Sequence, residues 1–354
     1  MSATDRQDVR LGLIGLGRMG MLHAENLARG ALGIELVRVA DASEEVAAAA
    51  GKRFGVEWSV SAASVLDDSA VEGVVIATPT ATHAELVERA AAAGKHVFCE
   101  KPIAFDVEAT VHAVEAARSA GVKLQVGFHR RFDSDWADAT ARIRAGELGD
   151  VRLFRTSLRD KVAPKAEFLA GSGGFFVDVT IHDLDTARWM VGEIDEVTAF
   201  GAALTDPAVA ERGDGDNAVV VLRFAGGALG VIDNSREAVY GYECSTEVVG
   251  SQGTVRIAGH RRRNSEWLTP GSVAADWVVD FTERYPHAYR LELEAFARAI
   301  RDGTAPAVTG EDALAAFVLA SACERSRREG RTVRLTHEQA ASGVVYSERS
   351  GPSH

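Results

Sequence analysis

Residues 11–20 read Leu-Gly-Leu-Ile-Gly-Leu-Gly-Arg-Met-Gly, and this stretch decides the fold of the chain. The apolar run before Gly15 predicts a buried strand, and the residues that follow predict a helix. Between them lies the pattern G-x-G-x-x-G: Gly15 permits a tight turn, Gly17 lets backbone approach a pyrophosphate, and Gly20 lets helix and strand pack closely. The helix N-terminus would offer N–H groups and partial positive charge to phosphates. The stretch therefore predicts a dinucleotide-binding βαβ unit.

Asp41 is the second element of this pattern. It ends the next expected strand, about 20 residues after the glycines, where dinucleotide-binding folds carry an acid. A carboxylate here accepts hydrogen bonds from the two ribose hydroxyls and repels a 2′-phosphate, and the following Ala42 offers no cation. We therefore expect NAD as the cofactor in preference to NADP. Capping of the next helix is a compatible structural role for Asp41.

The first part of the chain alternates short apolar runs with alanine-rich helical stretches, as parallel sheets with crossover helices do. Ser43 and Asp106 can each cap a helix, whereas Gly94 and Gly121 can end one. The expected strands are 11–14, 34–40, 74–77, 97–99 and 124–128, and the expected helices are 19–29, 43–53, 82–93 and 106–121.

The pattern changes after about residue 134, where turn-rich segments at 225–227 and 251–253 separate alternating runs, as antiparallel hairpins require. We expect an α/β protein with an N-terminal Rossmann domain at 1–128, a C-terminal α+β domain with a mainly antiparallel open sheet at 129–338, and a tail at 339–354. The chain should be loose from Thr336, and the basic cluster His260–Arg263 should be a solvated loop. The expected strands are 151–157, 197–203, 218–224, 228–234, 245–249 and 254–257, and the expected helices are 135–145, 288–301 and 311–328.

The composition of the chain excludes several classes of partner and location. The chain has 354 residues, 46% hydrophobic content and a formal net charge of −12, without a long basic run. Nucleic acid is therefore not an expected partner. Three scattered cysteines are too few for a disulfide framework, which favours a reducing cytoplasm. The first apolar run is short, so we expect neither a signal peptide nor a membrane span.

A possible proton-transfer pair lies in the stretch 173–185, Gly-Gly-Phe-Phe-Val-Asp-Val-Thr-Ile-His-Asp-Leu-Asp. Asp178 precedes His182 by four residues, so the two side chains are expected on one helix face. A carboxylate beside an imidazole can orient it for proton transfer near neutral pH. A capped helix with one structural histidine is the alternative.

Glu100-Lys101-Pro102 follows an expected strand, and ligands bind at the carboxyl ends of strands in open α/β sheets. Together with the glycine loop, Ala77-Thr78-Pro79, His83 and residues 173–185, these residues resemble the Gfo/Idh/MocA oxidoreductase family over nearly the whole chain. The resemblance implies cofactor contacts from Gly15, Gly17, Arg18, Met19, Gly20, Asp41, Thr78, Pro79, His83, Glu100 and Lys101, and no metal.

Within that family, residues 180–189 and 233–242 are similar to those of inositol 2-dehydrogenases. This resemblance implies NAD-dependent oxidation of a ring hydroxyl of a polyol or pyranose sugar, and a homotetramer paired through the C-terminal open sheet. It implies that Lys101, Asp178 and His182 form the catalytic set. His182 is the candidate base, Asp178 orients it, and Lys101 stabilises developing alkoxide charge. The implied substrate contacts are Lys101, His129, Arg130, Asp160, Asp178, His182 and Tyr240.

Several alternatives stay open. Lys101 can be the proton acceptor in place of His182. An ion pair would also explain Arg130, and core packing would explain Tyr240. His129 stands where we expect an apolar residue, and Val179 where some relatives carry a hydroxyl, so the preferred polyol is open. Redox-neutral glycoside cleavage with retained NAD and a non-catalytic NAD-responsive regulator are the competing functions.

Overall fold

The computed structural model describes residues 8–31, 33–340 and 343–349. The chain forms two compact units, the first comprising Met1–Phe132 with His287–Leu314 and the second Asp133–Pro286 with Ala315–His354. We expected a division after residue 128 and a single contiguous C-terminal domain. The segment His287–Leu314 packs with the first unit although it is distant in sequence, and no local pattern in the sequence indicates this.

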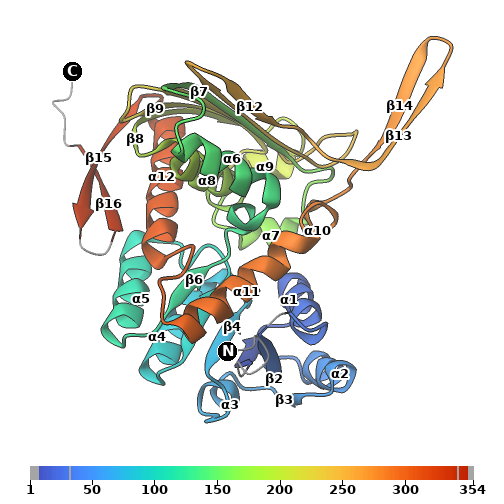
Figure 1. Ribbon diagram of the computed structural model, residues 1–354, viewed down its shortest axis with the longest axis vertical. Helices are drawn as coiled ribbons and strands as arrows, with labels where there is room; N and C mark the ends of the chain where they lie inside the picture. The colour runs from blue at the N-terminus through green and yellow to red at the C-terminus, as the bar shows by residue number, and fades with distance from the viewer. Residues whose placement is uncertain (1–7, 32, 341–342, 350–354) are drawn as a thin grey trace. The chain divides into compact units, whose positions relative to one another are not determined.

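The first unit is built on a six-stranded sheet whose strands are all parallel (Figure 1). Its strand order, 3-2-1-4-5-6, is that of the dinucleotide-binding Rossmann fold, as the sequence predicts. Ser43 and Asp106 cap their helices through Val46 N and Ala109 N. The strands are β1 (Val9–Ile14), β2 (Ile34–Ala40), β3 (Glu57–Ser59), β4 (Gly73–Ile76), β5 (His96–Cys99) and β6 (Leu124–Val126), and the helices are α1 (Arg18–Ala28), α2 (Glu44–Phe54), α3 (Ala63–Leu66), α4 (His83–Ala92) and α5 (Val107–Ser119).

Helix α11 (Pro286–Asp302) completes the core of this unit although it lies far along the chain. Its apolar face, with Leu293 and Phe296, packs in the same buried cluster as Leu11 and Phe98 of the sheet. Gln125 of β6 donates from its amide to the Glu292 main-chain oxygen at 2.7 Å. The hydrophobic effect and one buried hydrogen bond therefore attach this distant helix to the sheet.

The second unit is built on an eight-stranded sheet, in the order β12-β11-β7-β10-β9-β8-β15-β16. Among its described pairings only β7 with β10 is parallel, so the sheet is mainly antiparallel, as expected. The strands are β7 (Val151–Arg159), β8 (Ile194–Ala202), β9 (Asn217–Phe224), β10 (Leu229–Ser235), β11 (Glu243–Gly250), β12 (Thr254–Ile257), β15 (Val333–Ala340) and β16 (Gly343–Glu348).

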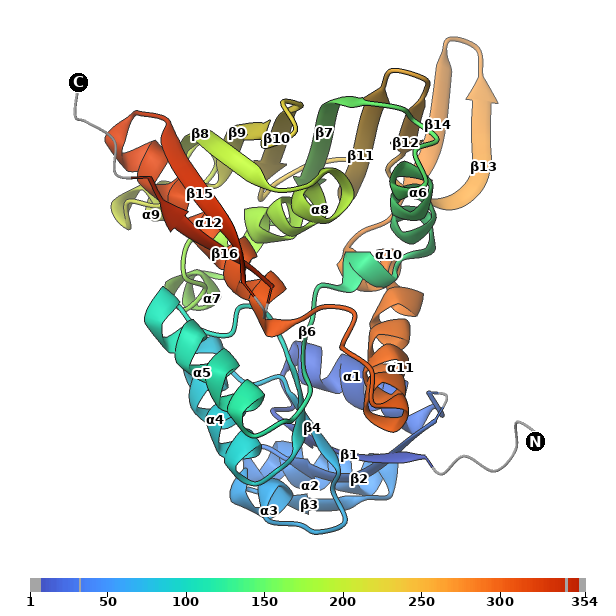
Figure 2. The same cartoon turned by 60° about the vertical axis from the view of Figure 1, so that its left-hand side comes forward.

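One face of this sheet is covered by the helices α6 (Ser134–Arg144), α8 (Ile181–Val191) and α12 (Gly310–Glu329) (Figures 1 and 2). Burial alternates along β9 and β10, as it does when one face of a sheet is packed and the other is open. The open face is nevertheless apolar. Its exposed side chains include Leu153, Phe200, Val219, Val221, Leu229 and Val231.

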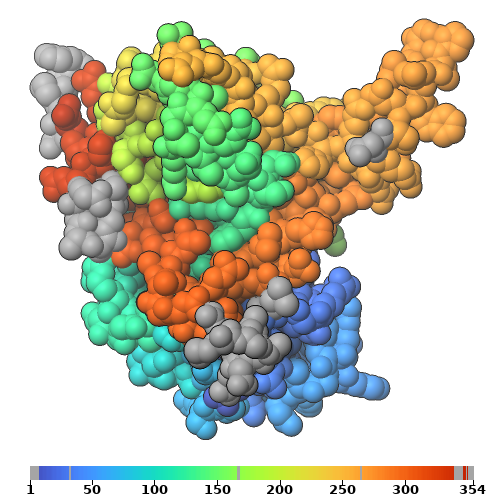
Figure 3. Space-filling model, viewed as in Figure 1, coloured from blue at the N-terminus to red at the C-terminus, as the bar shows by residue number. Residues whose placement is uncertain are grey.

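Two local expectations are wrong. The basic cluster is not a simple loop, because Arg261–Thr269 forms strand β13 and pairs with β14 (Ser272–Trp277) in a two-stranded ribbon that extends from the body of its unit (Figure 3). The chain also has regular structure beyond Thr336, where β15 pairs with β16, whereas Val333 and Arg334 of β15 pair with β8. Both segments are ordered by pairing with a neighbouring strand, which their polar local sequences do not indicate. Of the expected tail, residues 341–342 and 350–354 lie outside the described residues.

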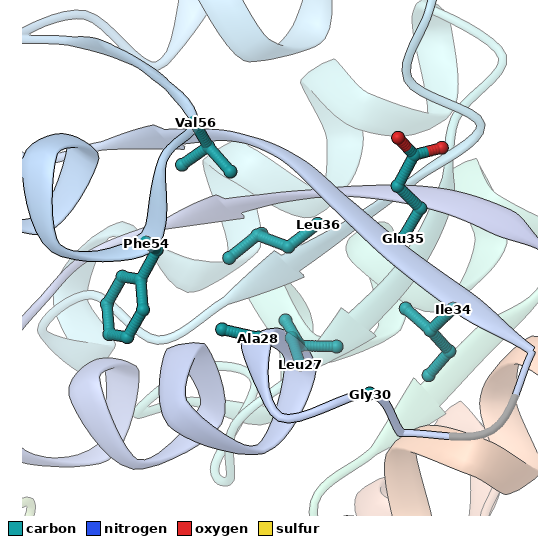
Figure 4. A pocket seen from close by; sticks show the side chains of 8 residues that line it. All are labelled: Leu27, Ala28, Gly30, Ile34, Glu35, Leu36, Phe54 and Val56. Atoms are coloured by element: carbon teal, nitrogen blue, oxygen red, sulfur yellow. The ribbon is translucent and has the colours of Figure 1, made fainter.

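The remaining helical segments are short and connect the larger elements. They are η1 (Thr80–Thr82), η2 (His129–Phe132), α7 (Ala166–Ala170), η3 (Phe176–Thr180), α9 (Pro207–Glu211) and α10 (Phe281–Arg284). Across the described ranges, no helix has both the length and the apolar character needed to cross a bilayer. A surface hollow between α1 and β2, lined by Leu27, Ile34, Leu36 and Phe54, lies toward the amino end of β2 and away from the glycine loop (Figure 4).

Candidate active site

The glycine loop between β1 and α1 has the geometry that the sequence predicts. Gly15 has a φ of +93°, and a Cβ there would lie 2.7 Å from the Ala77 and Thr78 backbone. A Cβ on Gly20 would lie 1.9 Å from the Gly15 oxygen. By contrast, a Cβ on Gly17 would meet nothing within 4 Å. Gly15 and Gly20 are thus required by packing, whereas the space beside Gly17 is open toward a ligand.

The N-terminus of α1 is suited to bind an anion. Its N-cap residue is Gly17, which has no side chain to satisfy the first N–H groups, and no acid lies in the first turn. The unsatisfied N–H groups and the helix dipole therefore favour a negative charge at this point. With the open space at Gly17, the loop fits a dinucleotide pyrophosphate, and Arg18 and Met19 begin the helix that would face it.

Asp41 lies just after β2 and connects the glycine loop with the start of α2. Its Oδ2 accepts a hydrogen bond from Leu16 N at 2.7 Å, and its Oδ1 accepts one from Ser43 N at 2.9 Å. The cap of α2 is Ser43, so Asp41 is not needed for that structural role. The half-buried carboxylate is fixed beside the glycine loop, as recognition of ribose hydroxyls requires.

His83 lies in the interior of the first unit, between two of its loops. Its ring is buried, with Nδ1 2.8 Å from Pro102 O and Nε2 2.7 Å from Thr78 O. Both ring nitrogens therefore face main-chain carbonyls, and His83 links the loop of Thr78 and Pro79 to the loop that follows Lys101. Burial lowers the pKa of His83, against the opposing effect of the two carbonyls. His83 is a residue that holds both loops in place.

Glu100 also points inward. Its Oε1 lies 2.6 Å from Nε2 of the fully buried His23 on α1, and its carboxylate packs against Gly127. Lys101, the next residue, is half-buried at the carboxyl end of β5. The contact of Glu100 with His23 therefore fixes the main chain next to Lys101.

His129 and Arg130 lie in the short turn η2 after β6, and both are buried. The His129 ring stacks on Tyr289 of α11, with ring centroids 4.7 Å apart. The neighbouring Arg131 pairs with Asp312 at 3.2 Å. Stacking on an aromatic ring explains how a histidine occupies this position, where the sequence led us to expect an apolar residue.

In the second unit, the turn with Asp178 is a π-helical segment, η3, which continues into α8 with His182. Gly173 and Gly174 precede it with φ values of +80° and +94°, conformations that favour glycine. Asp214 accepts a hydrogen bond from Phe175 N at 3.0 Å and so satisfies the start of the segment. Widened helical turns of this kind are frequent at functional sites. The expected regular helix is therefore corrected to a π-turn followed by an α-helix.

Arg236 is a residue of the candidate site that no motif in the sequence indicates. Its Nη1 donates to Asp178 Oδ2 at 2.9 Å, its side chain is 1% exposed, and its guanidinium lies over the Phe175 ring. Its main-chain N also donates to Asp216 O. The quoted stretch 233–242 contains Arg236, but no spacing in the sequence connects it with Asp178.

A second buried network attaches α8 to the sheet. Asp183, adjacent to His182, accepts hydrogen bonds from the Thr156 hydroxyl at 3.1 Å and from Asn234 Nδ2 at 2.8 Å. Asp183 is fully buried, so its carboxylate serves this anchor. The helix that carries His182 is thereby held against β7 and β10.

Asp160 and Tyr240 lie near the ends of β7 and β10 in this unit. The Asp160 N donates to Ser235 O at 3.0 Å, which places Asp160 at the ends of these two strands. The Tyr240 hydroxyl donates to Glu243 at 2.9 Å and accepts from Arg159 at 3.1 Å. Tyr240 is about half exposed, so core packing does not explain its position. Burial raises the pKa of Tyr240, the hydrogen bond from Arg159 opposes this shift, and Glu243 adds to it.

A Rossmann unit with a complete dinucleotide loop, followed by a unit that presents an oriented carboxylate and a histidine, defines a dinucleotide-dependent oxidoreductase. The chain belongs to the Gfo/Idh/MocA family: residues 9–128 match the model described as oxidoreductase family, NAD-binding Rossmann fold, and residues 140–335 match its C-terminal alpha/beta domain.

Individual relatives agree with this assignment. The chain is 39% identical over 338 residues, covering 95% of this chain and 99% of the relative, to a scyllo-inositol 2-dehydrogenase (NAD(+)) of Bacillus subtilis. It is 40% identical over 331 residues, covering 92% and 98%, to a myo-inositol 2-dehydrogenase of Thermotoga maritima. It is also similar to the structure of scyllo-inositol dehydrogenase from Lactobacillus casei with bound NAD(H) and scyllo-inositol, with a TM-score of 0.87, 30% identity and coverage of 93% and 99%.

Proposed function

We propose that the protein is an NAD-dependent dehydrogenase that oxidises a ring hydroxyl of an inositol or a related cyclic polyol to a ketone. The observation that carries this proposal is the match to inositol 2-dehydrogenases over nearly the full length of both chains. The anion-binding geometry at Gly17 and the buried Arg236–Asp178 pair support it from the physical side.

The cofactor is held by the first unit. The N-terminus of α1, with Gly15, Gly17, Arg18, Met19 and Gly20, would bind the pyrophosphate, and Asp41 would bind the adenosine ribose hydroxyls. We assign Thr78, Pro79, Glu100 and Lys101 to the border of this site. The buried His83 ring contacts Thr78 O and Pro102 O and so holds two of its loops in place. When bound, NAD accepts the hydride of the alcohol. Asp41 and the absence of a cation at Ala42 favour NAD over NADP.

The proton chemistry is assigned to Lys101, Asp178 and His182. His182 takes the hydroxyl proton, and the Asp178 carboxylate orients its imidazole and stabilises the protonated ring. Lys101 donates a hydrogen bond to the same hydroxyl and stabilises the developing alkoxide. Arg236, whose Nη1 lies 2.9 Å from Asp178 Oδ2, holds this carboxylate in place. The reverse assignment, with Lys101 as proton acceptor, is tested by the pH profiles described in the Discussion.

We assign recognition of the remaining hydroxyls to His129, Arg130, Asp160 and Tyr240. Polyols are bound through several directed hydrogen bonds, and these side chains offer both donors and acceptors. The stacking of His129 on Tyr289 and the contacts of Tyr240 with Arg159 and Glu243 restrict their rotamers. Restricted side chains give a recognition site stereochemical selectivity, which discrimination between inositol isomers requires.

The test is turnover by the purified protein with NAD and a panel containing myo-inositol, scyllo-inositol and glucose, followed by NADH absorbance. We expect NADH with at least one inositol, and we expect Lys101→Met to reduce kcat by a factor on the order of 100 or more. Absence of NADH with every polyol would refute the proposal. Release of an aglycone from a glycoside without net NADH would instead establish a redox-neutral enzyme.

We further propose that the chain forms a homotetramer through the open face of the eight-stranded sheet. Phe200 and Val221 are among the large apolar side chains exposed there, and a contiguous exposed apolar face is typical of a protein–protein interface. Light scattering after size exclusion should give a tetramer for the parent protein and smaller species for Phe200→Glu with Val221→Glu. Leu204→Glu, at an exposed position beyond the end of β8, is the matched control and should remain tetrameric.

We also place the enzyme in the cytoplasm. Cys99, Cys244 and Cys323 are buried thiols outside any disulfide, which is typical of proteins from reducing compartments. Fractionation of cells that express the full chain tests this assignment, and recovery of the protein outside the cytoplasmic fraction would contradict it.

A further inference from the structure

Three ionisable side chains that the proposed mechanism does not use meet in the interior of the first unit. They are His23 on α1, Glu100 directly after β5, and Glu292 on α11. One candidate ligand atom from each lies within 4.8 Å of those from the other two, and all three residues are buried. The cluster thus joins the helix of the glycine loop, the residue before Lys101 and the distant helix that completes the core.

His23 and Glu100 are directly paired. The His23 Nε2 lies 2.6 Å from Glu100 Oε1, and the His23 ring makes edge contacts with Phe98 and Tyr289. Glu100 N donates to Ile76 O at 3.0 Å, so its main chain is fixed as well. The paired Glu100 side chain is therefore attached to a fixed stretch of main chain that carries Lys101 as its next residue.

Glu292 is the unusual member of the cluster. Neither carboxyl oxygen has a hydrogen-bond partner among the described residues, although the side chain is fully buried. An unpartnered carboxylate in an apolar interior, with a second carboxylate nearby, is strongly disfavoured, and such a group takes up a proton instead. In agreement, burial and then the charge of Glu100 raise the pKa of Glu292 well above its ordinary value of 4.5.

A metal ion fits this geometry less well. Two ligand atoms of one tetrahedral zinc ion lie roughly 3.3 Å apart, as bond lengths near 2.0 Å imply. His23 Nε2 and Glu100 Oε1 are closer than this, at the separation of a short hydrogen bond. The pair is therefore already satisfied internally, which leaves the proton on Glu292 as the means of balancing the charge.

We propose that His23, Glu100 and Glu292 form one buried cluster of ionisable side chains in which Glu292 is a neutral acid at neutral pH, and that this cluster positions both Lys101 and the helix of the dinucleotide loop. These three are positioning residues, because they act through the main chain of Lys101 and through α1. The catalytic consequence rests on the proposed dehydrogenase function, whereas the protonation of Glu292 does not.

Other ionisable groups surround the cluster and define its electrostatic setting. Lys101 and Cys99 flank Glu100 in the chain, His83 interacts electrostatically with both Glu100 and Lys101, and the Tyr289 ring lies between those of His23 and His129. Among the described residues, the charge of Glu100 raises the pKa of Glu292 in addition to burial. A titration of Glu292 is therefore separable from the others by substituting Glu292 itself.

The direct test is an infrared difference spectrum between the parent protein and Glu292→Gln at neutral pH, without cofactor or substrate. We expect the parent to show the carbonyl stretch of a protonated carboxylic acid, and the variant to lack it. Glu294→Gln, two residues later on the same helix and paired with Arg290 in the parent, is the control and should retain the band. A parent spectrum without such a band would overturn the proposal, as would one equivalent of bound metal by elemental analysis.

Thermal stability gives a second measurement that needs no activity. A raised pKa means that the folded state keeps the proton after the unfolded state has lost it, so the stability due to Glu292 is complete below pH 4.5 and declines as pH rises through the folded-state pKa. The Tm of Glu292→Gln should therefore rise relative to the parent with increasing pH. A difference in Tm that is independent of pH would contradict the proposal.

The positioning role is tested by the pH dependence of kcat/KM. In the parent, loss of the Glu292 proton at alkaline pH disturbs the cluster and with it Lys101, so the alkaline limb of the profile should move to higher pH in Glu292→Gln and stay in place in Glu294→Gln. A purely structural role would leave the limb of Glu292→Gln unmoved. If the protein turns over no polyol, the infrared and thermal measurements still decide the protonation of Glu292.

Discussion

The Arg236 guanidinium donates to the Asp178 carboxylate at 2.9 Å, and its side chain is almost completely buried. The same guanidinium lies 5.2 Å from the centre of the Phe175 ring, one turn before Asp178. Arg236 therefore fixes the direction of the carboxylate that precedes His182. The position of Asp178 thus depends on Arg236, which lies on the segment that follows β10.

Arg236→Met should leave Asp178 without its buried partner and release the π-turn. We expect kcat/KM to fall by a factor on the order of 100, since small displacements of catalytic groups have effects of this size, and Tm to fall as well. The KM for NAD should change little. The control is Arg223→Met, which removes an exposed ion pair with Glu196 on the same sheet and should change neither quantity measurably. An unchanged kcat/KM in Arg236→Met would exclude a positioning role.

Gly17→Ala and Gly20→Ala should separate cofactor binding from folding. A Cβ at Gly17 meets open space, so Gly17→Ala should keep the parent Tm but weaken NAD binding by about tenfold or more, because the methyl group enters the pyrophosphate position. A Cβ at Gly20 collides with the Gly15 oxygen, so Gly20→Ala should lower the Tm. Thermal unfolding and fluorescence titration with NAD measure the two effects. Equal effects of both substitutions on Tm would contradict the geometry.

Asp41→Asn tests the basis of cofactor preference. The amide can still accept a hydrogen bond from Leu16 N, so the fold should persist, but the negative charge that repels a 2′-phosphate is lost. We expect the ratio of kcat/KM for NAD to that for NADP to fall by about tenfold. Steady-state kinetics with each cofactor provides the ratio. An unchanged ratio would mean that Asp41 serves the glycine loop alone.

His182→Gln distinguishes the two candidate bases. If His182 takes the proton, kcat should fall by a factor on the order of 10² to 10⁴ and the acidic limb of the pH profile should disappear. Persistence of that limb in His182→Gln would transfer the role to Lys101. Asp178→Asn should preserve the limb but lower kcat, since it leaves the imidazole in place without its charged neighbour.

His83→Gln tests the acid sensitivity of the two loops. Burial lowers the pKa of His83 below its ordinary value of 6.5, so the neutral ring stabilises the fold above that pH, and the stabilisation is lost as pH falls toward the folded-state pKa. Between neutral pH and about pH 5, the Tm of the parent should therefore decrease more than that of His83→Gln. Parallel decreases would show that protonation of His83 does not affect stability.

Much of the first unit could be predicted from the sequence because its signals are local. The expected segment 34–40 coincides with β2, as 254–257 does with β12 in the second unit, and Ser43 and Asp106 cap the expected helices. The errors arise where pairing with a distant segment overrides local composition. The ribbon Arg261–Trp277 and the strand Val333–Ala340 are polar locally and are ordered by their cross-strand neighbours.

The sequence by itself determined the dinucleotide loop, the acid at Asp41 and the family, because each depends on residue types at short, fixed spacings whose geometry the backbone sets. Only the tertiary structure decided which groups complete the candidate sites. Arg236 lies 58 residues from Asp178, and His23 lies 77 residues from Glu100. No regular spacing in the sequence marks such pairs, because the packing of whole helices and strands brings them together. Burial then makes their charges interdependent.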